Sequence, residues 1–274
     1  MTYLLVLLLG AIAVGALVIA SRMRRKKRRS RLLDTPLPAG HRQVLDRNLP
    51  LYRRMPAELR NRLHGITNVL LDEKRFIGCG GLEVTEEMRV TIAGHASLLL
   101  LNRPGDFYPG FTSILVYPDT YFADEITYDG DVEVHERVER VGESWHRGPV
   151  VLSWQDILHG LSADGGGMNV ILHEFAHKLD EQNGETEGLP VLHDDEHYAE
   201  WTEVLGREFA LLTEAVETGT DSVLDDYAVT SPAEFFAVAT EAFFESARRM
   251  RDELPDLYGQ LQRYYAIDPA SWHE

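Results

Sequence analysis

Two histidines and a glutamate form the group of residues best suited to do chemistry. The segment HEFAH places His173 and His177 four residues apart, with Glu174 directly after the first histidine. On a helix this spacing puts both imidazoles on one face, one turn apart, where they can bind a single zinc ion. Glu174 lies beside that face, from which a carboxylate acts as general base in zinc-dependent hydrolysis. The motif therefore predicts a hydrolytic site with one Zn²⁺ ion.

The residues around this motif favour a buried helix. Residues 168–182 contain no Gly or Pro, and Asn183 and Gly184 then give a helix C-terminal signal. Apolar side chains occupy nearly all sides of this stretch, so we expect the helix to be buried. Polar side chains buried in such a helix need a partner, which a metal ion supplies. Asp180, on the same face, is a candidate to orient one imidazole.

A zinc site of this kind needs a third protein ligand. An extended three-histidine motif is excluded, because Asp180 and Asn183 stand where its glycine and third histidine would be. A later segment, SPAEFFAVATEAFFE, offers carboxylates along one stripe of a helix. These carboxylates belong to Glu234, Glu241 and Glu245.

Two interpretations of Glu234 remain open from the residues alone. Glu234 can be the third ligand, or it can complete a capping box with Ser231, with Pro232 at the first helical position. His193 and His197 are also four residues apart, but their acidic setting, HDDEH, indicates a solvated loop rather than a metal site.

The charge distribution excludes some classes of function. The chain has 274 residues, 44% of them hydrophobic, enough for one large or two small globular domains. Its formal net charge is -17, and every acidic residue follows the basic stretch near the N-terminus. The body is therefore strongly acidic, which argues against a nucleic-acid partner. The single cysteine, Cys79, cannot form an internal disulfide, and its setting in GCGG indicates a turn with a small buried thiol.

The N-terminus has the pattern of a membrane anchor. Residues 3–20 are all apolar or Gly, enough to cross about 30 Å of hydrocarbon as a helix. Eight Lys and Arg residues follow between Arg22 and Arg31, the reverse of the order in a secretory signal peptide. The positive-inside rule places the body on the cytoplasmic side of the cell (inner) membrane, with anionic lipid headgroups against the basic stretch. We therefore expect a transmembrane anchor (1–21), a basic juxtamembrane segment and linker (22–40) and a catalytic domain (41–274).

The pattern of apolar residues predicts a mixed fold for the body. The predicted elements are short helices within 42–72 broken at Pro50 and Pro56, a helix over 85–102, strands over 113–117 and 148–154, and a hairpin or exposed loop pair over 124–141. The strand over 148–154 precedes the metal motif. It is either an edge with which an extended peptide pairs or an ordinary core strand.

Three segments together resemble the Mlc titration factor A family of zinc-dependent, gluzincin-like peptidases. They are GPVVLSW, HEFAHKLD followed by NG, and DDYAVTSPAEFFAV, and the similarity extends over roughly residues 41–269. The resemblance implies an α+β fold, a zincin-like metallopeptidase domain similar to the catalytic domain of anthrax lethal factor. It also implies a set of site residues: His173, His177 and Glu234 as zinc ligands, Glu174 as catalytic base and Tyr227 as hydrogen-bond donor to the transition state.

Residues and resemblance together predict a membrane-anchored zinc peptidase, aminopeptidase-like and regulatory, that acts on a peptide or protein substrate. One alternative is a membrane-bound regulatory protein that sequesters a partner such as a transcriptional repressor, since the family's partner is the glucose-responsive repressor Mlc. Another is a zinc enzyme that cleaves a non-peptide bond. The intact Glu174 favours an enzyme, because a purely structural zinc site has no use for a base beside an open coordination position.

Overall fold

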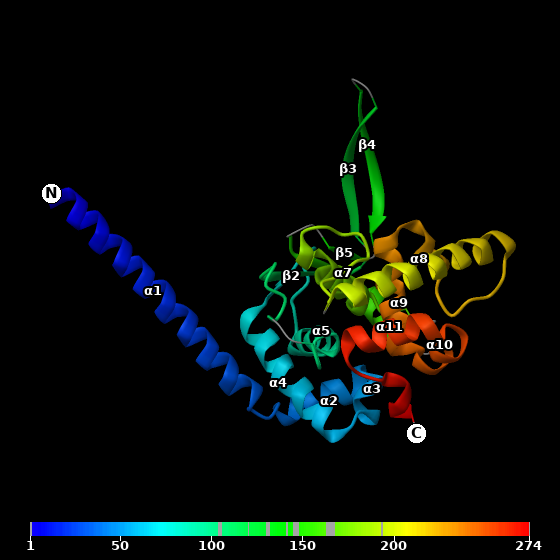
Figure 1. Ribbon diagram of the computed structural model, residues 1–274, viewed down its shortest axis with the longest axis horizontal. Helices are drawn as coiled ribbons and strands as arrows, with labels where there is room; N and C mark the ends of the chain where they lie inside the picture. Colours follow the sequence, from blue (N-terminus) through cyan, green and yellow to red (C-terminus); the bar gives the residue numbers. More distant parts are fainter. Residues whose placement is uncertain are drawn as a thin grey trace.

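Helices make up most of the regular structure and surround a small mixed sheet (Figure 1). The computed structural model describes residues 2–103, 106–119, 121–129, 132–140, 142–144, 148–162, 168–192 and 194–273, with side chains over 14–103, 106–119, 148–162, 168–192 and 194–272. The elements are α1 (Thr2–Leu33), α2 (Ala39–Asn48), α3 (Pro50–Arg54), α4 (Ala57–Glu73), β1 (Arg75–Gly78), α5 (Glu86–Leu98), β2 (Ser113–Tyr117), β3 (Tyr121–Asp129), β4 (Val132–Arg140), β5 (Gly142–Ser144), β6 (Val150–Ser153), α6 (Trp154–Gly160), α7 (Val170–Asp180), η1 (Glu181–Asn183), α8 (Asp195–Thr218), η2 (Asp226–Thr230), α9 (Pro232–Glu245), α10 (Ala247–Glu253), α11 (Pro255–Tyr265) and η3 (Pro269–His273). This mixed and mostly helical architecture is compatible with a metallopeptidase domain.

The first helices of the body begin where the prolines and caps predict. Pro50 is the first residue of α3, and Pro56 is the N-cap of α4. At these positions the missing N–H group costs nothing, because the first turn of a helix has no acceptor for it. Thr85 caps α5 by accepting a hydrogen bond from the Met88 N–H at 3.2 Å. The predicted breaks in 42–72 and the predicted helix after Thr85 are therefore confirmed.

The four-stranded sheet has the order β1-β2-β6-β5. Strands β1, β2 and β6 run parallel, and β5 pairs with β6 in the antiparallel direction. All four residues of β6 are buried, since the strand has a neighbour on each side. The interpretation of residues 148–154 as a free edge is wrong, and the core-strand alternative is confirmed. The strand at that end of the sheet is the short β5.

The polar segment between β2 and β5 forms a long hairpin. Strands β3 and β4 pair antiparallel from Tyr121↔Arg140 to Asp129↔Val132. Figure 1 shows this hairpin extending away from the body, on the side where α7 and α8 lie. The hairpin alternative for residues 124–141 is confirmed.

The core is built around α7 and α9. These helices pack against each other, and α7 also contacts β5, β6 and α5. On α9 the aromatic side chains of Phe235, Phe236, Phe243 and Phe244 are at most 1% exposed. Tyr264 and Tyr265 of α11 pack edge to face among them. Each buried aromatic ring removes about 150–250 Å² from water, so this cluster fixes the position of α9 firmly.

The basic stretch is part of the folded body rather than a linker. Helix α1 continues through it to Leu33, and its last turns lie on α4. Arg25 and Arg29 both bind the Glu73 carboxylate, at 2.7 Å and 2.6 Å. Burial raises the pKa of Glu73, but the hydrogen bonds from Arg29 and Arg25 outweigh it and lower this pKa to about 2. Glu73 is therefore a carboxylate at any physiological pH.

The connection between α1 and α2 is also fixed to the body. Asn68 donates hydrogen bonds to the carbonyls of Leu32 and Thr35, at 3.3 Å and 2.8 Å. Leu37, in the predicted linker, is 1% exposed. Within the predicted juxtamembrane segment and linker (22–40), this turn therefore packs on α4.

The predicted membrane span over residues 3–20 falls mainly on residues whose side chains lie outside the described ones. Within α1 this stretch is helical. Among the described residues, no helix has both the length and the apolar character needed to cross a membrane. Membrane anchoring therefore remains a prediction from the sequence.

Gly65 sets how closely α1 can approach α4. A Cβ atom at this position would lie 2.4 Å from the Leu33 carbonyl oxygen. We expect Gly65→Ala to displace the end of α1 and to cost about 1–3 kcal/mol of unfolding free energy. Trypsin should then cleave within residues 22–31 faster than in the wild type, measured by mass spectrometry of timed digests.

Gly40→Ala is the matched control for this variant. Gly40 lies in α2, and a Cβ atom added there would have no other atom within 4 Å, so alanine should leave cleavage unchanged and stabilise slightly. Equal cleavage of the Gly65→Ala variant and the wild type would contradict the docking of α1 on α4.

Candidate metal centre

The N-terminus of α7 is held by Asn169. Its side-chain oxygen accepts a hydrogen bond from the Leu172 N–H at 3.1 Å, which satisfies one of the free donors of the first turn. The helix spans Val170–Asp180, slightly shorter than predicted, and continues as the single turn η1. His173 and His177 therefore face the same direction, with their ring centroids 4.8 Å apart.

Helix α9 brings Glu234 to the two histidines. Ser231 caps this helix by accepting from the Glu234 N–H at 3.2 Å, and Pro232 occupies the first turn. The Glu234 carboxylate points toward α7, where its Oε2 lies 2.9 Å from His173 Nε2 and 3.3 Å from His177 Nε2. The Ser231 cap thus uses the Glu234 backbone, while the Glu234 carboxylate lies at the imidazoles and not at the Ser231 N–H, where a complete capping box would place it.

Three ligand atoms converge at one point. His173 Nε2 and His177 Nε2 are 3.2 Å apart, and both face Glu234 Oε2. Ligands at about 2.0–2.1 Å from a tetrahedral zinc ion are separated by roughly 3.3 Å, so this triangle has the size of one face of such a site. Two imidazole nitrogens and one carboxylate oxygen are also the ligand types that zinc prefers. The residues present therefore fit a zinc ion.

The electrostatics of the site favour a positive charge between these groups. Burial lowers the pKa of His173, but hydrogen bonds with Glu234 and Glu241 outweigh it and raise this pKa to about 10. Burial raises the pKa of Glu234, and the two imidazoles more than offset it, so that this pKa is lowered overall. The carboxylates thus stabilise a cation at the His173 side chain, and a bound metal ion satisfies the same requirement.

Glu241 is a site residue whose role the sequence did not assign. Its Oε1 lies 2.8 Å from His173 Nδ1, and its Oε2 accepts from the Asn169 N–H. This contact fixes the imidazole with Nε2 directed at the centre of the triad. Glu245, one turn later, accepts from Asn169 Nδ2 at 2.7 Å. The signal was present, because Glu241 lies two helical turns after Glu234 on the same stripe.

Asp180 does not take the part that the sequence suggested. Its Oδ2 accepts from the Gly188 N–H at 2.7 Å, so it closes the loop after α7. Among the described residues, neither imidazole has a hydrogen bond to Asp180. Burial raises the pKa of Asp180 to about 6, against the opposing effects of the Gly188 N–H and His177. The carboxylate that contacts an imidazole is Glu241 instead.

Glu174 and Tyr227 both lie beside the triad. Glu174 is 4% exposed, and its charge contributes to the raised pKa of His173. Tyr227 belongs to η2, which packs against α9, and its ring centroid is 6.1 Å from that of His173. Tyr227 is 53% exposed. The structure therefore brings together all five site residues predicted from the sequence.

The other residues considered from the sequence lie elsewhere. His193 is outside the described residues. His197 is fully buried in α8, with its ring 5.9 Å from that of Trp201, so the expected solvated loop is wrong at this position. The GCGG turn follows β1 as predicted, with positive φ angles at Gly80 and Gly81. Cys79 is half-buried there, so the predicted burial of its thiol is wrong.

Comparison with known proteins gives consistent similarities. Residues 22–266 match the family described as glucose-regulated metallo-peptidase M90. An uncharacterized protein of Synechocystis sp. is 37% identical over 244 residues, which cover 88% of this chain and 89% of that protein. The Mlc titration factor A of Pectobacterium atrosepticum is 35% identical, over 82% of this chain and 85% of its own. The Mlc titration factor A of Salmonella agona is 32% identical, over 81% and 84% respectively.

The contact between Glu241 and His173 leads to a test of metal binding. We expect Glu241→Gln to weaken zinc binding by about 10–100-fold, because the imidazole loses the carboxylate that orients it. The affinity is measured by competition with a chromophoric chelator. Glu245→Gln is the matched control, since Glu245 contacts Asn169 and not an imidazole, and it should change the affinity less. Equal effects of the two variants would show that Glu241 acts only through the end of α7.

Proposed function

The chain belongs to the glucose-regulated metallo-peptidase M90 family, and from this premise we propose that it hydrolyses peptide bonds with one zinc ion. The observation that carries the proposal is the convergence of His173 Nε2, His177 Nε2 and Glu234 Oε2 within 3.3 Å of one another. Three protein ligands leave a fourth position of a tetrahedral ion for water or substrate, as in catalytic rather than structural zinc sites. Glu174 on the same helix supplies the base that such a site needs.

Each residue around the triad has a separate role in the proposed reaction. A zinc ion held by His173, His177 and Glu234 would supply Lewis acidity, both to the scissile carbonyl and to a water molecule that loses its proton near neutral pH. Glu174 accepts that proton and then delivers it to the leaving amine. Tyr227, through its exposed phenol, donates a hydrogen bond to the oxygen that becomes negative. Glu241 keeps the His173 ring in one orientation during these steps.

The free edge of the sheet supports the choice of an extended peptide as substrate. Strand β5 pairs with β6 on one side, and no strand among the described residues pairs with its other side. Helix α7 packs against β5, so this edge lies close to the triad. An extended peptide that pairs its backbone with β5 would lie across the site, with one of its peptide bonds next to the triad.

A second function is favoured by the names of the relatives. Two of the proteins compared above are named as factors that titrate Mlc. In this alternative the chain binds a protein partner, such as a transcriptional repressor, and sequesters it. The hairpin β3–β4 projects from the body (Figure 1), and among the described strands each of its two strands pairs only with the other, which leaves an edge on each for such a partner. Partner binding and peptide hydrolysis differ in their dependence on Glu174, which only hydrolysis requires.

Attachment to the membrane is a further part of the proposal. The sequence from residue 3 to residue 20 is apolar or Gly, and eight Lys and Arg residues follow it. The side chains of Val14, Leu17 and Ile19 are 61%, 70% and 61% exposed on α1. Exposed apolar side chains on a helix are costly in water and find a favourable solvent in lipid. By the positive-inside rule, we propose that the catalytic residues lie on the cytoplasmic side.

The test of the peptidase mechanism is the variant Glu174→Gln in the full chain. We expect it to bind zinc normally and to lose at least about 10²-fold in the rate of peptide cleavage, because the general base is removed. The rate is measured with a panel of fluorogenic peptides and aminoacyl substrates, and zinc content by atomic absorption. If the zinc-loaded wild type and the variant both fail to cleave, the partner-binding function takes first place.

Membrane attachment is tested by fractionation of cells that express the full chain. We expect the protein in a membrane fraction that resists alkaline carbonate and dissolves in detergent. The double variant Leu8→Arg and Val14→Arg should move it to the supernatant, since each arginine costs about 2.5–3.5 kcal/mol in a membrane helix. Val191→Arg, at an exposed apolar residue of the body, is the matched control. A wild-type chain released by carbonate would exclude a membrane span.

A further inference from the structure

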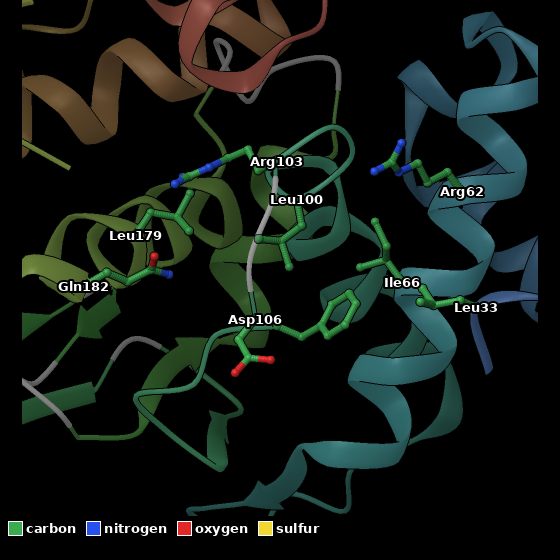
Figure 2. A pocket seen from close by; sticks show the side chains of 9 residues that line it. Leu33, Arg62, Ile66, Leu100, Arg103, Asp106, Leu179 and Gln182 are labelled. Carbon is green, nitrogen blue, oxygen red and sulfur yellow. The ribbon is translucent and has the colours of Figure 1, made fainter. Parts of the chain in front are cut away.

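A cavity of about 280 Å³ lies behind the metal-binding helix (Figure 2). Its walls come from the end of α1, from α4, from the segment after α5 and from the C-terminal end of α7 with η1. The lining residues are Leu33, Arg62, Ile66, Leu100, Arg103, Asp106, Phe107, Leu179 and Gln182. None of them belongs to the metal centre, and we propose that this cavity binds a small organic anion with an apolar body.

The cavity and the metal centre lie on opposite sides of α7. Leu179 follows His177 by two residues, which is about 200° of rotation around the helix axis. The side chain of Leu179 therefore faces away from the imidazoles, and Figure 2 shows it among the residues that line the cavity. A molecule in the cavity contacts the metal-binding helix without reaching the zinc ligands. The site is thus separate from the place where a substrate would react.

The charges at the cavity favour an anion. Arg62 reaches toward it from α4, and its guanidinium has no hydrogen bond or ion pair within the part of the chain that the structure describes. Arg103 stacks on the Tyr264 ring, with its Cζ 4.0 Å from the centroid, and donates to the Tyr264 hydroxyl. This stacking fixes the orientation of the planar Arg103 guanidinium, whose other N–H groups can donate to a second acceptor. Two arginines thus line one cavity in a chain whose net charge is -17.

The acidic group of the lining does not cancel this positive charge. The Asp106 carboxylate forms an ion pair with Arg29 of α1. Its charge is therefore already compensated by a residue outside the lining. Arg62 and Arg103 remain as the donors available to a ligand, and arginine binds carboxylate and phosphate oxygens through two parallel hydrogen bonds.

The remaining walls call for an apolar body on the ligand. Five of the nine lining residues are apolar, namely Leu33, Ile66, Leu100, Phe107 and Leu179. The volume of about 280 Å³ is near the lower end for small-molecule sites, which are about 300–1,000 Å³. A compact aromatic or branched carboxylate can bind an arginine through its carboxylate group and contact the apolar lining residues with its body. A bare inorganic anion leaves the apolar walls in contact with water.

Two contacts of α1 lie at the rim of the cavity, so ligand binding should stabilise the docking of this helix. Leu33 ends α1, and the Arg29–Asp106 ion pair ties α1 to the loop that carries Arg103. A ligand in the cavity also contacts Leu33, and that contact exists only while the end of α1 is docked. It should therefore slow tryptic cleavage within residues 22–31 as well as bind.

The experiment measures binding of 3-phenylpropanoate to the full chain by isothermal titration calorimetry. We expect saturable binding with a Kd of about 1 mM or tighter. The neutral 3-phenylpropanamide and inorganic phosphate should each bind at least tenfold more weakly, because each lacks one of the two features that the cavity recognises. Bound 3-phenylpropanoate should also lower the rate of tryptic cleavage within residues 22–31.

Variants locate the binding at this cavity. Arg62→Gln should weaken binding of 3-phenylpropanoate by at least about tenfold, the effect of losing one charge-assisted contact. Arg53→Gln is the matched control, because Arg53 is an exposed arginine paired with Asp46 away from the cavity. Leu179→Ala gives a second test that leaves both arginines in place. The proposal is overturned if the wild type does not bind, if the amide or phosphate binds equally well, or if Arg62→Gln has no effect.

Discussion

The main physical constraint on this structure is that two imidazoles and a carboxylate must be held close together inside the protein. His173 Nε2, His177 Nε2 and Glu234 Oε2 lie within 3.3 Å of one another, where two nitrogen lone pairs and a negative oxygen repel unless a positive charge sits between them. Helices α7 and α9 must therefore be held against each other by forces independent of the site. The aromatic cluster on α9 and α11 supplies them, because its rings are almost completely buried.

Helix α9 carries both a ligand and the group that orients another ligand. Glu234 lies at its first turn and Glu241 two turns later, so both carboxylates face α7. A rotation of α9 about its axis would remove both contacts with His173 together. The same helix also holds the end of α7 through Asn169, which Glu241 and Glu245 both contact. The carboxylates of α9 thus both orient the His173 imidazole and hold the residue that caps α7.

The sequence predicted what is local and missed what is not. The helix with His173 and His177, its neighbouring helices and strand β2 follow from spacing, caps and apolar periodicity within a few residues. The role of Glu234 needed a family resemblance, because a capping box explains the same residues equally well. The position of β6 between two strands could not be predicted, since pairing partners are set by the whole sheet. The docking of α1 depends on the ion pairs of Arg25 and Arg29 with Glu73. The paired residues are separated by 48 and 44 positions in the sequence, so no local pattern predicts them.

The continuity of α1 has a mechanical consequence. The helix passes from Thr2 to Leu33 without a break, about 48 Å, and its last turns are bound to α4 by Glu73 and by the close approach at Gly65. A chain with a flexible hinge at this point could turn freely about its N-terminal segment. Here a continuous helix joins that segment to the folded body instead. Whatever holds the outer end of α1 therefore also sets the direction in which the metal centre faces.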